Sequence, residues 1–195
     1  LNPDKTVRQQ LFSFLEHNGH PITDMGYFLA YKAVAIKRKY DIETGEEIIN
    51  VKYDEDTGER YEETLTQSMT FKPFHRGSHG MTIKVGTPIT MPREECDSDP
   101  DRTCSNGLHV GSMAYVDDFG HGDSVILEVL VSPRNVVAVP TDYNNTKMRC
   151  CEYYAYGIVD LDNDMSITTP YFEHDYKTWE TEALEKELQE YKKER

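Results

Sequence analysis

Cationic and aromatic side chains gather between positions 102 and 157 in a pattern that could bind an anionic ligand with a flat ring. Arginine donates paired hydrogen bonds to phosphate or carboxylate oxygens, lysine offers a point charge, and aromatic rings stack on bases. The candidate ligand-binding residues share a cationic, aromatic or amide side chain: Lys32, Arg102, His109, Tyr115, Tyr143, Asn144, Lys147, Arg149 and Tyr153. Their types suit an adenine or ribose-phosphate group.

Several of these candidates also have a purely structural interpretation, which the sequence leaves open. His109 lies in an apolar segment, where a core histidine is the simpler explanation. Arg102, Lys147 and Arg149 flank the ends of predicted strands and could instead pair with the many carboxylates of the chain. Asn144 belongs to a turn-forming run, whose composition alone explains it.

The cysteines favour reduced thiols over a metal site. The four cysteines at 96, 104, 150 and 151 form no CxxC pair, so we expect no zinc site. The acidic residues near Gly58 resemble a calcium loop in composition, but the glycine and the last glutamate are out of register. For Cys104, a buried thiol is favoured over a nucleophile, because no base is visible beside it. We therefore expect neither a metal nor a cofactor.

Charge excludes some classes of partner. The net charge is -14, with 35 acidic and 21 basic residues, whereas broad nucleic-acid or anionic-membrane binding requires a basic surface. Much of the acid lies at 41–63 and 173–194, where a solvated surface is expected. No apolar run approaches the roughly 18 residues of a membrane span. The chain also lacks the P-loop, GxGxxG, GxSxG and HExxH motifs.

The secondary-structure pattern predicts an α+β domain with a mixed, mostly antiparallel sheet of about six to eight strands. Asp4 can cap a helix over 4–17. The clearest expected strands are apolar or alternating runs at 27–36, 124–130, 135–139 and 152–159. We expect one domain over 1–175 with a charged hairpin inserted at 41–63, followed by a C-terminal helix at 176–195.

The C-terminal helix has one apolar stripe, formed by Trp179, Ala183, Leu184, Leu188 and Tyr191. The stripe either packs on the core or meets a partner. Packing is favoured, because a large side chain such as Trp179 is usually buried.

Several blocks in a fixed order resemble the rIIB-like proteins of tailed bacteriophages. The blocks that support this resemblance lie at 26–34, 91–93, 101–110 and 135–150. The similarity extends from about Val7 to about Val159, and family members usually have a further N-terminal segment. The resemblance implies a phage protein that acts in the cytoplasm of the infected host, in lysis control and in resistance to host exclusion systems.

A second resemblance, to ADP-ribosyltransferases of the poly-ADP-ribose polymerase type, covers 107–115 and 152–156. It implies that Tyr115 stacks on nicotinamide, and that Glu152 holds a ribose hydroxyl and stabilises an oxocarbenium-like transition state. The strand that should present His or Arg beside Gly instead has Tyr31 and Lys32, and the middle serine motif is absent. An ADP-ribosyltransferase-like fold thus stays open, and catalysis is disfavoured.

The favoured hypothesis is a non-enzymatic phage protein that counters host defence by sequestering an NAD- or ADP-ribose-type signal. One alternative is an enzyme acting on NAD, with Glu152 as its catalytic residue. Another is an inhibitor that binds a host defence or lysis protein through the acidic surface and the helix at 176–195. Homo-oligomerisation is left open.

Overall fold

The computed structural model describes most of the chain. The described residues are 2–38, 52–53, 60–61, 70–73, 81–117, 124–142, 146–160, 166–168 and 176–193.

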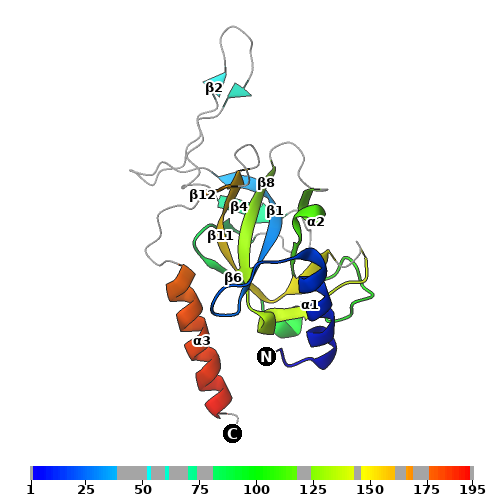
Figure 1. Cartoon of the computed structure of the whole chain (residues 1–195). Helices are drawn as coiled ribbons and strands as arrows, with labels where there is room; N and C mark the ends of the chain where they lie inside the picture. Colours follow the sequence, from blue (N-terminus) through cyan, green and yellow to red (C-terminus); the bar gives the residue numbers. More distant parts are fainter. Residues whose placement is uncertain are drawn as a thin grey trace.

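A curved, antiparallel ten-stranded sheet forms the body of the protein (Figure 1). Its main path runs β12-β11-β8-β1-β7-β10-β9, while β4 and β5 extend from β1, and β6 pairs with β11. The strands of the path are β1 (Phe28–Arg38), β7 (Leu108–Gly111), β8 (Ser124–Val131), β9 (Val136–Ala138), β10 (Lys147–Cys150), β11 (Glu152–Asp160) and β12 (Ser166–Thr168). The others are β4 (Thr70–Pro73), β5 (Ile83–Lys84) and β6 (Pro88–Thr90).

The centre of the sheet is the β1–β8 pair, which is in register from Phe28 opposite Val131 to Ala35 opposite Ser124. Both strands are rich in valine, isoleucine, leucine and alanine, which suits strands buried on both faces. The predicted strands at 27–36, 124–130 and 152–159 are confirmed, with ends shifted by a residue or two. A 3-10 turn, η4 (Pro133–Asn135), precedes β9, so the expected strand at 135–139 is shorter than predicted.

Side chains alternate across the sheet and create two layers. On one face Phe28, Ala30 and Val34 join the main core, which the helix α1 (Lys5–Asn18) covers. On the other face a smaller cluster packs Val116 of the short helix α2 (Met113–Asp117) against Ile126. These two layers decide which candidate site residues can meet.

Helix α1 confirms the predicted N-terminal helix. Asp4 accepts hydrogen bonds from the amides of Thr6 and Val7 at its start. Gly19 ends the helix in the left-handed conformation, with φ at 60°. Immediately after this, the buried His20 stacks on Phe14, with ring centroids 4.7 Å apart.

The turn η4 joins the start of the chain to the C-terminal helix. The buried Asn2 amide donates from Nδ2 to the carbonyls of Pro133, Arg134 and Val136, at 2.9, 3.2 and 2.6 Å. The Arg134 guanidinium forms an ion pair of 3.3 Å with Glu190. One short turn therefore contacts both the N-terminal segment and the helix at the other end of the described chain.

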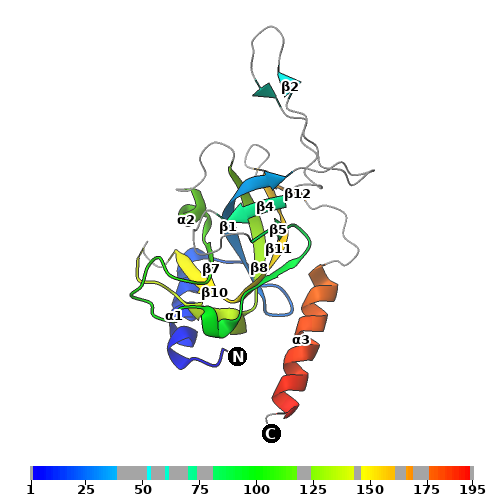
Figure 2. The same cartoon turned by 180° about the vertical axis from the view of Figure 1, so that it is seen from behind.

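Helix α3 (Tyr176–Lys193) confirms the predicted C-terminal helix. In Figures 1 and 2, α1 and α2 lie to one side of the strands and α3 lies to the other. Leu184 is 42% exposed and Leu188 is 55% exposed, so the expectation that the apolar stripe is packed is wrong for these two residues.

The α+β class and the mostly antiparallel sheet are confirmed, while similarity to ADP-ribosyltransferases is not shown. The sheet has more strands than expected, partly because charged segments such as β10 also pair. Within the expected hairpin at 41–63, β2 (Lys52–Tyr53) pairs antiparallel with β3 (Arg60–Tyr61). The rest of that segment lies outside the described residues.

Candidate functional site

Strand β10 places Lys147 and Arg149 side by side on the face of the sheet that α2 covers. Antiparallel pairing sets Lys147 opposite Gly111 and Arg149 opposite His109 on β7, and Figure 2 shows these strands together. Lys147 begins this four-residue strand and Arg149 precedes its last residue, so both cations take part in the strand pairing. They are 2% and 0% exposed. We call Lys147 and Arg149 the cationic pair.

The Arg149 side chain donates hydrogen bonds to main-chain carbonyls of the loop at 97–106. Its guanidinium donates to the carbonyl of Arg102 at 2.8 Å and to the carbonyl of Asp99. Its Nε is buried and makes no hydrogen bond, and no carboxylate lies at ion-pair distance from it in the described part of the chain. Burial lowers the pKa of Arg149, and the nearby negative charges of Asp97, Asp99 and Asp142 oppose this effect.

Lys147 binds both a carboxylate and a main-chain carbonyl. Its Nζ donates to the Asp142 carboxylate at 2.7 Å and to the Thr103 carbonyl at 2.7 Å. The ammonium also lies 5.8 Å from the centroid of the Tyr115 ring, within the range of a cation–π interaction. Two buried cations thus hold successive carbonyls of one surface loop.

Tyr115 projects from α2 onto β7, where Gly111 makes room for it. A Cβ on Gly111 would lie 2.5 Å from Tyr115 Cδ1 and 2.6 Å from the Thr146 carbonyl oxygen. The ring therefore packs against the strand backbone, with Lys147 beside it. Close packing on Gly111 leaves less of the ring available to stack on a ligand.

The loop at 97–106 also has interactions of its own. The Ser105 hydroxyl and the amide of Asp99 donate to Asp97, and these hydrogen bonds lower the pKa of that carboxyl, the serine contributing most. The Arg102 side chain is 70% exposed and lies 3.4 Å from Asp97 and 3.5 Å from Asp99. Arg102 therefore contributes its carbonyl to the site, while its side chain stays on the surface.

Lys32 and Tyr153 lie on the other face of the sheet, within the main core. Lys32 Nζ donates to the His109 carbonyl at 2.7 Å and lies 5.8 Å from the Tyr153 ring centroid. Burial lowers the pKa of Lys32 to about 8. The Tyr153 hydroxyl is enclosed and makes no hydrogen bond within the described residues. Lys32 and Tyr153 therefore lie apart from the cationic pair, on the opposite face of the sheet.

The remaining candidates are more scattered. His109 is half-buried on β7 opposite Arg149. Glu152 begins β11, pairs opposite Thr90 and is partly exposed. Tyr143 and Asn144 lie outside the described residues.

Cys104 is exposed, so the expectation that its thiol is buried is wrong. All four cysteines have free thiols. The described residues contain no group of His, Cys, Asp or Glu side chains arranged to hold a metal ion. No helix among them is long and apolar enough to cross a membrane.

The sequence interpretation missed residues that complete the site. Ser112 Oγ and Asp142 Oδ1 are both buried without a hydrogen-bond partner among the described residues, and Asp142 pairs with Lys147. The spacing of Lys147 and Arg149 was the available signal, because positions i and i+2 share one face of a strand. Nothing in the sequence indicated that loop carbonyls would be their acceptors.

Comparisons with known proteins identify relatives of this chain. Residues 76–159 match the family described as Bacteriophage T4 protein rIIB. The chain is also 33% identical over 152 residues to Protein rIIB of Enterobacteria phage T4. That alignment covers 78% of this chain and 38% of the phage T4 protein. No solved structure matches the chain. Together, the two matches support the assignment of this chain as an rIIB-like phage protein.

Proposed function

We propose that this phage protein is a non-enzymatic binding protein that counters host defence by sequestering a nucleotide-derived signal of the NAD or ADP-ribose type. The observation that supports this proposal is the cationic pair, which lies beneath the 97–106 loop and beside Tyr115. The proposed place of binding is the cytoplasm of the infected host, where an infecting phage would meet such a signal.

The acceptors of the cationic pair support an anionic ligand. Arg149 is fully buried, yet its direct contacts are two neutral carbonyls, and its Nε has no hydrogen bond. A buried charge is stable only when it is well paired, and a phosphate offers charge-assisted hydrogen bonds that are stronger than those to a carbonyl. A pyrophosphate would therefore replace the carbonyls of Asp99, Arg102 and Thr103 once the loop moves away.

The residues around the cationic pair suit the rest of such a ligand. The unpartnered Ser112 hydroxyl and Asp142 Oδ1 would accept or donate hydrogen bonds with ribose hydroxyls. The Tyr115 ring lies near Lys147, so its outer part would contact a base.

Isothermal titration calorimetry with NAD and ADP-ribose tests the proposal. We expect binding by the wild type and at least about tenfold weaker binding by Lys147→Gln, because a charged contact to phosphate is lost. Lys84→Gln is the matched control, since Lys84 is exposed on β5. Thermal unfolding of each variant separates a loss of binding from a loss of fold.

Parallel ligand-observed NMR distinguishes binding from catalysis. Broadened ligand signals without products support sequestration. Release of nicotinamide that Glu152→Gln abolishes would support the alternative of an enzyme. Absence of any binding by the folded wild type would overturn the nucleotide proposal.

A second candidate function is inhibition of a host protein through α3. It is favoured by the exposure of Leu184 and Leu188, which lie one turn apart on that helix. If it is correct, capture of host proteins by the wild type is lost in Leu184→Lys/Leu188→Lys. Capture that is unchanged in this variant would contradict it.

A further inference from the structure

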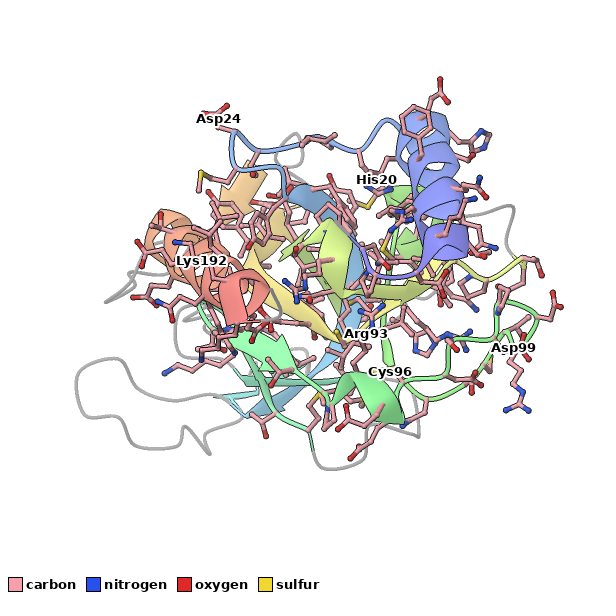
Figure 3. All side chains as sticks on the ribbon, turned by 90° about the horizontal axis from the view of Figure 1, so that it is seen from below. His20, Asp24, Arg93, Cys96, Asp99 and Lys192 are labelled. Atoms are coloured by element: carbon pink, nitrogen blue, oxygen red, sulfur yellow. The ribbon has the colours of Figure 1, made fainter. Side chains whose placement is uncertain are left out.

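A groove on the underside of the sheet lies outside the cationic pair and is not used by the proposed function. It is an open hollow of about 610 Å³ between the N-terminal segment, the 3-10 helix η3 (Arg93–Glu95) and the edge strand β9. Figure 3 views this side of the protein, with Arg93 and Cys96 labelled close together. We call it the underside groove.

The floor of the underside groove is apolar. Pro3, Cys96 and Val137 line it, and Val137 and Cys96 are 3% and 8% exposed. The Cys96 thiol lies near the carbonyls of Pro92 and Cys150, at 3.5 and 3.8 Å. Burial raises the pKa of Cys96 to about 11, so the thiol is neutral at ordinary pH and adds no charge to the floor.

The rim of the underside groove is acidic on two sides. Asp4, at the start of α1, and Glu94, on η3, both line it and both are exposed. Asp4 uses Oδ1 for both of its helix-capping bonds. The acidic surface continues along the chain from Glu94 through Glu95 to the aspartates at 97, 99 and 101.

Among the described residues that line the groove, Arg93 is the one cation, and its guanidinium is directed inward. Arg93 donates to the carbonyls of Arg134 and Val136 at 2.9 and 3.1 Å, beneath the turn η4. Its Nη1 and Nη2 atoms therefore donate to that turn rather than to the carboxylates of the rim. Ser98 also lines the groove, and its side chain is exposed at the mouth.

We propose that the underside groove docks a basic segment of a protein partner. A lysine or arginine would lay its methylene stem on Val137 and Cys96, and its charged head would reach Asp4 and Glu94. The net charge of -14 favours the approach of such a segment over long distances. Residues that bind a nucleotide under the proposed function are not involved, so the two proposals can fail separately.

Fluorescence anisotropy with a labelled peptide of alternating lysine and alanine tests this proposal. The comparison peptide has glutamate in place of lysine. We expect the basic peptide to bind and the acidic one not to bind. Failure of the basic peptide to bind, or equal binding of both, would overturn the proposal.

Charge variants locate the contact. Asp4→Asn/Glu94→Gln removes both rim charges while asparagine still caps α1, so we expect about five- to tenfold weaker binding. The control Glu16→Gln/Asp24→Asn removes two exposed charges elsewhere, and Figure 3 labels Asp24 far from Arg93. If both double variants weaken binding equally, overall charge alone attracts the peptide and the groove is not its site.

A bulky, uncharged substitution tests whether the peptide occupies the groove itself, independently of the rim charges. Ser98→Trp places a large side chain at the mouth without changing any charge. We expect it to weaken binding at least about fivefold, since the stem of the bound lysine loses its place on the floor. Wild-type affinity in Ser98→Trp would show that the peptide binds elsewhere, and would overturn the proposal.

Discussion

Substitution of Lys32 allows a direct measurement of how much a buried charge lowers the free energy of unfolding of this fold. Lys32 lies in the main core, 8% exposed, with its Nζ bonded to the His109 carbonyl and no carboxylate at ion-pair distance among the described residues. Lys32→Met keeps a flexible chain of similar length and removes the ammonium. The variant also loses the hydrogen bond to His109, a loss that is nearly constant with pH.

The magnitude follows from the pKa of Lys32, which is about 8 in the folded chain and 10.5 for an ordinary lysine. At about 1.4 kcal/mol for each pH unit, the charged form destabilises the fold by about 3 kcal/mol. Below about pH 8 both states hold the proton and this cost is fully present. Between pH 8 and 10.5 the unfolded chain binds more protons, so the free energy of unfolding rises with pH.

Chemical denaturation of wild type and Lys32→Met at a series of pH values checks this prediction. The free energy of unfolding of the wild type should gain about 3 kcal/mol relative to the variant between about pH 7 and 10.5. Lys84→Met, which removes an exposed ammonium from β5, should change in parallel with the wild type. Parallel profiles for Lys32→Met and the wild type would refute the reasoning that burial depresses this pKa.

Three other perturbations test the packing. Gly111→Ala should lower the free energy of unfolding by about 1–3 kcal/mol, because the new Cβ would meet the Tyr115 ring at 2.5 Å; a loss below about 0.5 kcal/mol would show that α2 moves away easily. Asn2→Ala should cost about 1–3 kcal/mol in denaturant titrations, since buried carbonyls lose their donor, whereas Asn106→Ala on the surface should cost less. Burial lowers the pKa of His20 below 6.5, so the unfolded chain binds more protons in acid and stability should fall as pH drops below about 6.5; His20→Gln should flatten that profile, and an unchanged profile would contradict it.

The elements that could be predicted from the sequence are those whose local residue pattern matches the structure that they adopt. The Asp4 cap and Gly19 bracket α1, and apolar runs mark β1 and β8. In these segments local preference, apolar pattern and burial all indicate the same structure. The class of the fold followed from them.

Strand β10 could not be predicted in this way, because its charged residues interrupt the apolar pattern. Carbonyls from a loop more than forty positions earlier in the chain accept hydrogen bonds from the buried Lys147 and Arg149, and Lys147 also pairs with Asp142. Such long-range partners are invisible in a local pattern. For the same reason the sequence did not reveal that Lys32 and Tyr153 point into the main core, since the face of a strand depends on its register with its neighbours.

The hydrogen bonds between the cationic pair and the 97–106 loop affect how the sequence of this loop can evolve. In this loop, Lys147 and Arg149 donate hydrogen bonds to main-chain carbonyl oxygens, which every amino acid provides. The side chains of Arg102 and Thr103 are directed outward and can be replaced without removing those acceptors. The loop can therefore vary in sequence while it keeps its shape, so that new surface chemistry can evolve on it at little risk to the fold.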